Sequence, residues 1–155
     1  MSVQAIPAGY SGIIPYLSIA GAAQAIEFYQ RAFGAREVFR LDGPDGRVGH
    51  AELQIGEAHF MLADPCEQSP VRNAPTAEHI PLGLYLYVED VDVRFAQALE
   101  AGARELMAVQ THFYGDRSGS LRDPYGYVWY LASHVEDVAP DELQRRAGEL
   151  FKGRG

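Results

Sequence analysis

The chain has 155 residues, a length typical of one domain, and 47% of its residues are hydrophobic, as in ordinary globular proteins. Its formal net charge of −8, from 13 basic and 21 acidic residues, disfavours nucleic acid and anionic membranes as partners, because a phosphate-binding surface needs clustered Lys and Arg. The single cysteine, Cys66, excludes an intrachain disulfide, and no window approaches about 18 consecutive apolar residues. We expect a cytoplasmic protein that folds as one domain over residues 1–155.

The first half of the chain predicts one strand, one helix and three further strands. The helix is expected after the first strand, because small or apolar residues recur at helical spacing, at positions 22, 25, 26, 29, 32 and 33. Gly34 follows them, where glycine commonly ends a helix. The expected strands, separated by turns rich in glycine and proline, are residues 13–19, 36–41, 48–55 and 59–63.

The second half predicts the same series of elements. Residues 64–78 contain three prolines and few apolar side chains, which indicates a connecting loop; whether this loop, extended to residue 81, acts as a lid is left open. A helix is expected over residues 91–101, and the expected strands are residues 82–88, 104–110, 118–121 and 127–132. A C-terminal helix is expected over residues 140–151, starting at Pro140. Its apolar stripe is expected to pack on the body: Leu143, Ala147, Leu150 and Phe151.

The two halves also share residues at a near-constant offset. The segment 34–38 (GAREV) matches 102–106 (GAREL), an offset of 102 − 34 = 68, and Leu62-Ala63 matches Leu131-Ala132, an offset of 131 − 62 = 69. The sequence therefore predicts an α+β fold with two tandem βαβββ modules, residues 10–65 and 82–134, and a C-terminal helix. The modules are expected to form a curved mixed sheet around a cavity.

Alternation along the predicted strands separates an apolar face, expected under the helices, from an aromatic and polar face. The second face collects Tyr16, His50, Glu52, Met61, Tyr85, Tyr87 and Tyr130. Tyrosine offers a broad apolar ring with one polar tip, which suits a ligand pocket. The alternative is a half-exposed sheet face or a dimer contact. Arg122 is expected on the pocket side with Ser120, where a buried guanidinium needs an anionic partner.

Two residues of this face have the chemistry of an acid–base pair. His50 and Glu52 could act as a general base or as ligands of a displaced metal site; the alternative is a hydrogen-bonded polar pair at a strand edge. His59 could join them, although a solvated side chain is the favoured interpretation. His79 and His134 are expected at the surface.

Two further features have both a chemical and a structural interpretation. A loop cluster before the seventh strand could clamp a carboxylate or phosphate through its arginine, or could simply form a turn: His112, Tyr114, Asp116 and Arg117. Cys66 is expected to be an unreactive loop residue, because no basic residue lies near it in sequence.

The sequence resembles the glyoxalase/bleomycin-resistance/extradiol-dioxygenase superfamily, also called vicinal oxygen chelate, over about residues 10–135. The motifs that carry the resemblance, besides the doubled module, are 25–29 (AIEFY), 33–35 (FGA), 88–92 (VEDVD) and 123–129 (DPYGYVW). The resemblance implies one of several functions: a metal-dependent lyase, isomerase, epimerase or dioxygenase, a thiol transferase that inactivates fosfomycin, or a metal-free protein that sequesters antibiotics. It also implies a homodimer.

Enzymes of that family hold a divalent metal through His and Glu side chains on the first and last strand of each repeat. The resemblance carries these positions onto Ile14, Met61, Gly83 and Tyr130. None of these is an ordinary ligand of a hard metal, so we expect no metal and no cofactor.

Three hypotheses follow. The first is a metal-free homodimer that binds a small, aromatic organic ligand and sequesters a toxic or antibiotic compound. The second is a lyase or isomerase that uses His50 and Glu52, with or without a relocated metal. The third is a partner protein without a ligand, in which the tyrosine face is an interface.

Overall fold

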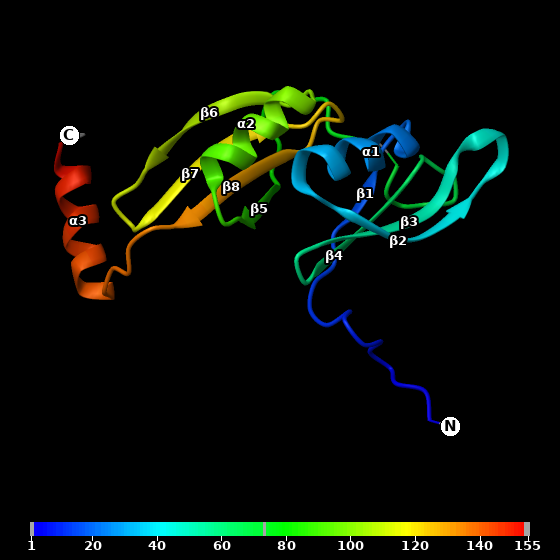
Figure 1. Cartoon of the computed structure of the whole chain (residues 1–155), viewed down its shortest axis with the longest axis horizontal. Helices are drawn as coiled ribbons and strands as arrows, with labels where there is room; N and C mark the ends of the chain where they lie inside the picture. Colours follow the sequence, from blue (N-terminus) through cyan, green and yellow to red (C-terminus); the bar gives the residue numbers. More distant parts are fainter. Residues whose placement is uncertain (1, 73, 154–155) are drawn as a thin grey trace. The chain divides into compact units, whose positions relative to one another are not determined.

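The computed structural model describes residues 2–72 and 74–153, and it confirms the α+β fold class with two tandem βαβββ modules and a C-terminal helix. The chain divides into two compact units, Met1–Glu78 and His79–Gly155. Their boundary lies in the segment that connects the two repeats, and each unit contains one module (Figure 1). The two units are described in turn.

The first unit builds a four-stranded mixed sheet with one helix. Its elements are β1 (Tyr16–Ser18), α1 (Ala22–Phe33), β2 (Arg36–Asp42), the short 3₁₀ turn η1 (Pro44–Gly46), β3 (Val48–Ile55) and β4 (Ala58–Ala63). The strand order is β1-β4-β3-β2, in which β1 and β4 are parallel and the other pairs antiparallel. The first and last strands of the module are therefore neighbours, and the helix is the crossover between β1 and β2.

Helix α1 forms because its apolar residues recur on one side and its end carries a stop signal. The buried stripe is Ala22, Ala25, Ile26, Phe28, Tyr29, Ala32 and Phe33. Gly34 then takes a left-handed conformation, with φ of 67°, and its N–H donates to the carbonyl of Gln30. The stripe packs on the buried face of the sheet, where Leu53 and Leu62 are among the largest fully buried side chains. Among the described residues of this unit, α1 is the one α-helix, so the opposite face of the sheet carries none.

The first strand is shorter than predicted. Residues 13–15 lie outside β1, and Ile13 is 99% exposed, whereas Leu17 and Ile19 are buried as expected. Gly12 turns the backbone at φ of 86°, and Pro15 has no N–H for the ladder, although its carbonyl still accepts from Met61 at 2.8 Å. Pairing with β4 therefore begins at Pro15 and ends where Ile19 donates to Ala63.

The second unit repeats this plan. Its elements are β5 (Gly83–Tyr87), α2 (Val91–Ala101), β6 (Arg104–Thr111), β7 (Asp116–Arg122), β8 (Val128–His134) and α3 (Pro140–Lys152). The strand order is β5-β8-β7-β6, with β5 and β8 parallel. Asp90 is the N-cap of helix α2, and its carboxylate accepts from Val93 N–H. The helix lies across β6, β7 and β8 (Figure 1). Helix α2 therefore covers one face of this sheet.

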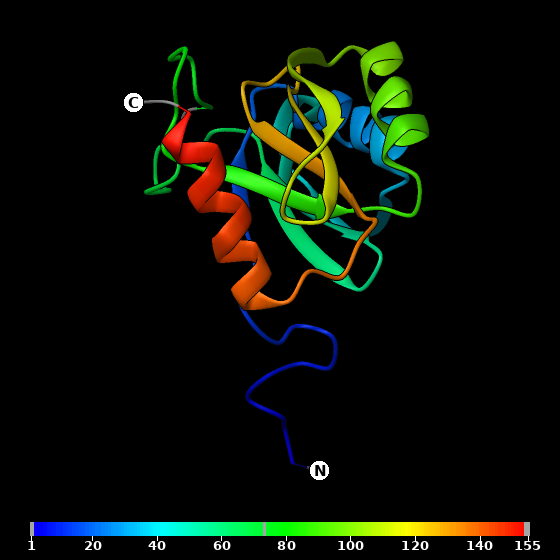
Figure 2. The same cartoon turned by 90° about the vertical axis from the view of Figure 1, so that its left-hand side faces the viewer.

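Helix α3 does not pack as predicted. No side chain of the helix is buried, and Phe151 of the expected apolar stripe is 61% exposed. The helix is held by polar contacts instead, because Arg146 donates to the Phe113 carbonyl and pairs with Glu136. Figures 1 and 2 show α3 well separated from α2, after the extended segment that follows β8.

None of the described helices is both long and apolar enough to span a lipid bilayer.

Candidate functional site

The uncovered sheet face of the first unit brings together the predicted histidine, glutamate and methionine. In the strand register, Met61 on β4 pairs with Tyr16 on β1 and with Glu52 on β3. Because residues paired across strands point to the same face, all three lie on the face opposite the buried Leu17 and Leu62.

Four polar side chains form one hydrogen-bonded chain on this face. The Tyr16 hydroxyl lies 3.0 Å from His50 Nδ1, and His50 Nε2 lies 3.1 Å from Glu52 Oε1. The other carboxylate oxygen, Glu52 Oε2, accepts from the Tyr10 hydroxyl at 2.5 Å. A neutral imidazole satisfies all these contacts when Nε2–H donates to Glu52 and Nδ1 accepts from Tyr16. The pair thus has the arrangement of a base oriented by a carboxylate.

The hydrogen bonds also set the ionisation of this chain. The Tyr10 hydroxyl, followed by His50, stabilises the charged carboxylate and lowers the pKa of Glu52. The same contact raises the pKa of Tyr10, since losing the phenolic proton would place two negative charges together. Glu52 therefore stays ionised to lower pH than an isolated glutamate.

Tyr10 is a member of this site that sequence reasoning missed. Residues 1–10 show no periodicity, and nothing local indicates that Tyr10 reaches Glu52, 42 residues further along. Its ring also stacks on His59, with centroids 4.3 Å apart. His59 is accordingly half-buried against Tyr10 and not freely solvated as predicted.

The uncovered face of the second unit carries a tyrosine stack. Tyr85 and Tyr130 are cross-strand partners, and their rings stack with centroids 5.5 Å apart and an interplanar angle of 12°. They remain 49% and 38% exposed. Both line a cavity of about 120 Å³, together with Met107, His112, Tyr114 and Ser120 among others. This volume is close to that of engineered protein cavities that hold a single benzene ring, about 150 Å³.

A second cluster on this unit centres on Asp116. This buried carboxylate accepts from the Tyr87 hydroxyl at 2.6 Å and lies 2.8 Å from His134 Nδ1; His134 Nε2 lies 2.7 Å from Asp137. Because both imidazole nitrogens face carboxylates, the two contacts are satisfied together by the doubly protonated ring. His134 lies at the surface as predicted, although both of its ring nitrogens face carboxylates, and Asp116 belongs to a strand and not to a turn.

These contacts shift the ionisation of three groups in the cluster. Burial opposes ionisation of Asp116, but the hydrogen bonds from Tyr87 and His134 outweigh it and leave its pKa below the usual value. The hydrogen bond that the Tyr87 hydroxyl donates to Asp116 also raises the pKa of Tyr87 to about 12. Asp116, followed by Asp137, raises the pKa of His134.

Arg122 lies on the uncovered face of β7 by register, opposite Val128. It is buried, and its Nε donates to the Gly126 carbonyl at 3.0 Å, so the turn Asp123–Gly126 supplies an acceptor for it. Arg122 is not among the residues that line the tyrosine cavity. Arg117, from the same strand, pairs with Asp92 on α2.

The positions at which the family resemblance implies a metal do not fit one. Met61 and Tyr130 offer a thioether and a phenol, and Ile14 and Gly83 offer no donor side chain. A Cβ built at Gly83 would lie 2.8 Å from Tyr130 Cε2, so the tyrosine ring occupies the space that a ligand side chain would need. Among the described residues, no group of three or more His, Cys, Asp or Glu side chains could hold a metal ion.

The two modules, each with one helix-covered and one uncovered sheet face, define a doubled βαβββ protein. The chain belongs to the Glyoxalase/Bleomycin resistance protein/Dioxygenase superfamily, whose family model matches residues 17–131. Members of this superfamily bind small-molecule ligands.

Relatives and solved structures agree with this membership. An uncharacterized protein of Mycobacterium tuberculosis is 40% identical over 133 residues, which cover 84% of this chain and 78% of that protein. The crystal structure of TioX from Micromonospora sp. ML1 matches with a TM-score of 0.63 and 25% identity, over 83% of this chain and 100% of the other. A glyoxalase-related enzyme from Fulvimarina pelagi shares the fold. It matches with a TM-score of 0.63 and 21% identity, over 80% of this chain and 88% of the other.

Proposed function

We propose that the protein binds a small organic molecule with an aromatic ring, without a divalent metal, and that it thereby sequesters a toxic or antibiotic compound. The observation that carries the proposal is the exposed Tyr85–Tyr130 stack beside a cavity of about 120 Å³. Aromatic pairs of this kind favour a further ring at stacking distance, and each such contact contributes about 0.5–1.5 kcal/mol beyond burial of area.

The other residues predicted to bind the ligand contribute in different ways in this proposal. Tyr87 borders the stack, since its ring centroid lies 5.3 Å from that of Tyr85. Tyr16 and Met61 supply the apolar part of the uncovered face in the first unit. Arg122 is assigned a supporting role, because its guanidinium is bonded to the Gly126 carbonyl.

The chemistry of the metal positions supports the metal-free part of the proposal. A thioether, a phenol, an alkyl side chain and a glycine leave a divalent ion without its usual imidazole and carboxylate donors. Metal analysis of protein purified without chelators is the direct test. A stoichiometric divalent ion would contradict this part of the proposal.

Ligand binding is tested by thermal melting with a set of planar aromatic compounds, since a ligand that binds only the folded chain raises the melting temperature. Tyr85→Leu and Tyr130→Leu should each abolish the shift. Phe151→Leu, which removes an exposed aromatic ring from α3, is the matched control and should leave the shift intact. Equal shifts in all four proteins would overturn the proposal.

A second candidate function is acid–base catalysis by a lyase or isomerase, favoured by the Tyr16–His50–Glu52–Tyr10 chain. Here His50 would accept a proton from a carbon acid and Glu52 would stabilise the resulting imidazolium. Compounds that raise the melting temperature would be incubated with the protein in D₂O and followed by NMR. Deuterium incorporation that is lost in the His50→Ala, Glu52→Ala double variant would support catalysis; unchanged compounds would leave binding as the function.

The proposal treats the two units as one working domain of a homodimer in the cytoplasm. Sedimentation equilibrium of the full chain tests the dimer. A monomer at all concentrations would remove the dimer from the proposal but not the ligand.

A further inference from the structure

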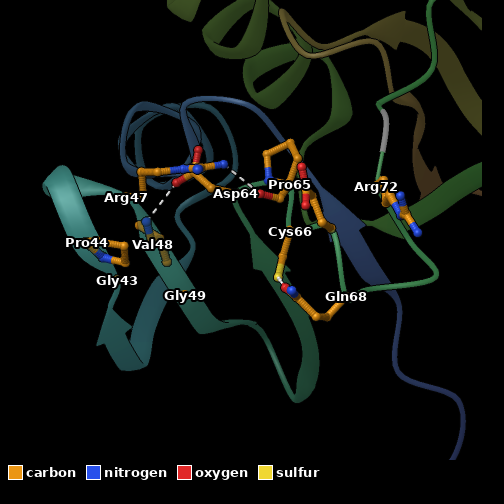
Figure 3. Close-up of a pocket in the computed structure, with 11 residues that line it drawn as sticks. Gly43, Pro44, Arg47, Val48, Gly49, Asp64, Pro65, Cys66, Gln68 and Arg72 are labelled. Carbon is orange, nitrogen blue, oxygen red and sulfur yellow. Dashed lines mark hydrogen bonds between the residues drawn. The ribbon is translucent and has the colours of Figure 1, made fainter.

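We propose that the first unit has a second binding site, for a small organic carboxylate, in the cavity between the β2–β3 turn and the loop after β4. This cavity has a volume of about 600 Å³ (Figure 3). Its walls come from residues 43–49 and from residues 64–72, and it shares no residue with the tyrosine cavity of the second unit. The proposed aromatic site and this site can therefore fail independently.

The two walls are tied together by hydrogen bonds. Asp64 Oδ2 accepts from Val48 N–H at 2.7 Å, and Arg47 Nη2 donates to the Pro65 carbonyl at 2.6 Å (Figure 3). The loop is also fixed to the sheet, because the Ser18 hydroxyl donates to the Arg72 carbonyl. A cavity held at several points loses less conformational entropy when it binds a ligand than a gap between free loops would.

The cavity has two guanidinium groups without carboxylate partners. Among residues 2–72 and 74–153, Arg47 and Arg72 form no ion pair and donate only to backbone carbonyls, Arg72 Nε to that of Ser69 at 2.8 Å. Each guanidinium has five N–H donors, so several on each side chain face the cavity or solvent. In a chain of net charge −8, two arginines on one cavity without an acidic partner favour an anion.

The two acidic side chains that line the cavity, Asp64 and Glu67, differ in whether their oxygens already have hydrogen-bond partners. Asp64 is engaged by the backbone, since Oδ1 accepts from Gly21 and Ala22 N–H and Oδ2 accepts from Val48 N–H. Glu67 is exposed and opposes the arginines. The two arginines therefore hold the unused donors for a carboxylate, since Asp64 is already held by backbone N–H groups, and Glu67 supplies a variant with the opposite expected sign.

A neighbouring cavity indicates where the organic part of the ligand would lie. This second cavity, of about 290 Å³, shares Gly49, Asp64, Cys66 and Gln68 with the first and is also lined by Tyr16 and Val71. A carboxylate held by the arginines would thus extend its body along Cys66 toward Tyr16.

The only cysteine of the chain makes the site measurable. Cys66 is exposed, lines the cavity, and in the view of Figure 3 lies between Arg47 and Arg72. Iodoacetate and iodoacetamide alkylate it by the same step: sulfur bonds to the methylene carbon, the carbon–iodine bond breaks, iodide leaves and the thiol proton passes to water. The rate with iodoacetate divided by the rate with iodoacetamide cancels the intrinsic reactivity of the thiol. This ratio therefore reports the attraction of the site for the carboxylate of iodoacetate.

The experiment compares this ratio in the full-length protein and its variants. Arg47→Gln and Arg72→Gln should each lower it by about two- to fivefold, the range expected for exposed ion pairs. Glu67→Gln should raise it by a similar factor, and added salt should lower it. Arg36→Gln removes an exposed arginine outside the cavity and should leave the ratio unchanged, and Arg47→Lys, which keeps the charge, should preserve most of it.

A second measurement uses benzoate, which does not alkylate. It should slow both reagents at Cys66 in the native protein and not in the Arg47→Gln, Arg72→Gln double variant. Equal rate ratios in the native protein and both single variants, or protection by benzoate that survives the double variant, would overturn the proposal. Failure of the tyrosine variants in the melting experiment would leave these results unaffected.

Discussion

Asp64 and Ser133 occupy equivalent places in the two repeats, at an offset of 133 − 64 = 69 residues, and each accepts a hydrogen bond from the N-terminal end of its own module's helix. Asp64 Oδ1 lies 2.9 Å from Gly21 N and Ser133 Oγ lies 2.9 Å from Val91 N. A residue at the C-terminal end of each module, just after β4 or within β8, thus caps the helix that starts near the module's beginning. Different side chains perform this task because the anionic Asp64 also serves Val48, whereas Ser133 donates to the Val88 carbonyl.

The capping role predicts an asymmetric loss of stability. Asp64→Ala leaves three N–H groups without their acceptor and should lower the free energy of unfolding by about 2–4 kcal/mol, whereas Ser133→Ala should cost about 1–2 kcal/mol. Urea unfolding followed by circular dichroism measures both. Equal losses in the two variants would contradict the asymmetry.

The Asp116 cluster predicts a pH window of extra stability. The pKa of Asp116 is lowered in the folded protein, so its contribution is present above its usual pKa of 3.8 and is lost as pH falls through the folded value. The pKa of His134 is raised, so its contribution is present below its usual pKa of 6.5 and is lost as pH rises through the folded value. Both contributions are present together from about pH 4 to about pH 6.5.

Asp116→Asn should flatten this pH profile. Trp129 is the only tryptophan of the chain and lies on β8, so its fluorescence follows unfolding of the second unit. His79→Gln, which removes an exposed histidine outside the cluster, should retain the native profile. A native profile in Asp116→Asn would show that the cluster contributes nothing to stability.

The contact between Tyr10 and Glu52 predicts a change of ionisation. Tyr10→Phe keeps the ring on His59 but removes the hydroxyl that stabilises the carboxylate, so the pKa of Glu52 should rise toward its usual value. Carboxyl carbon shifts measured by NMR across a pH titration report this directly. No upward movement would mean that Tyr10 does not hold Glu52 in solution.

The close approach of Gly83 to Tyr130 predicts a substitution that alters the tyrosine stack alone. In Gly83→Ala the new methyl group would lie 2.8 Å from Tyr130 Cε2, so the ring must leave the position in which it stacks on Tyr85. We expect a stability loss of about 1–2 kcal/mol and a loss of the melting shift with aromatic compounds. A full ligand shift in this variant would place the binding site elsewhere.

Much of the fold follows from local patterns. The limits of α2 and β3 agree with the predicted residues 91–101 and 48–55, because the side-chain pattern lies within those segments and caps or turn glycines flank them. Strand β7 is longer than predicted, since Asp116 and Arg117 are polar and resemble a turn until their partners on other elements are known.

The candidate sites were predicted only in part, for the same reason. Strand alternation is sufficient to bring Met61, His50 and Glu52 to one face. It gives no information on contacts across many residues, such as Tyr87 with Asp116, 29 residues apart. The apolar stripe of α3 was misjudged because periodicity identifies a face but not what lies against it.

The parallel pairing of the outer strands has a consequence for biosynthesis. Tyr16 meets Met61 and Tyr85 meets Tyr130, so each module closes a loop of 61 − 16 = 45 and 130 − 85 = 45 residues that lies wholly within itself. Such self-contained closure confines these pairings to one module, so the N-terminal module can complete its sheet on the ribosome while the second is still being translated.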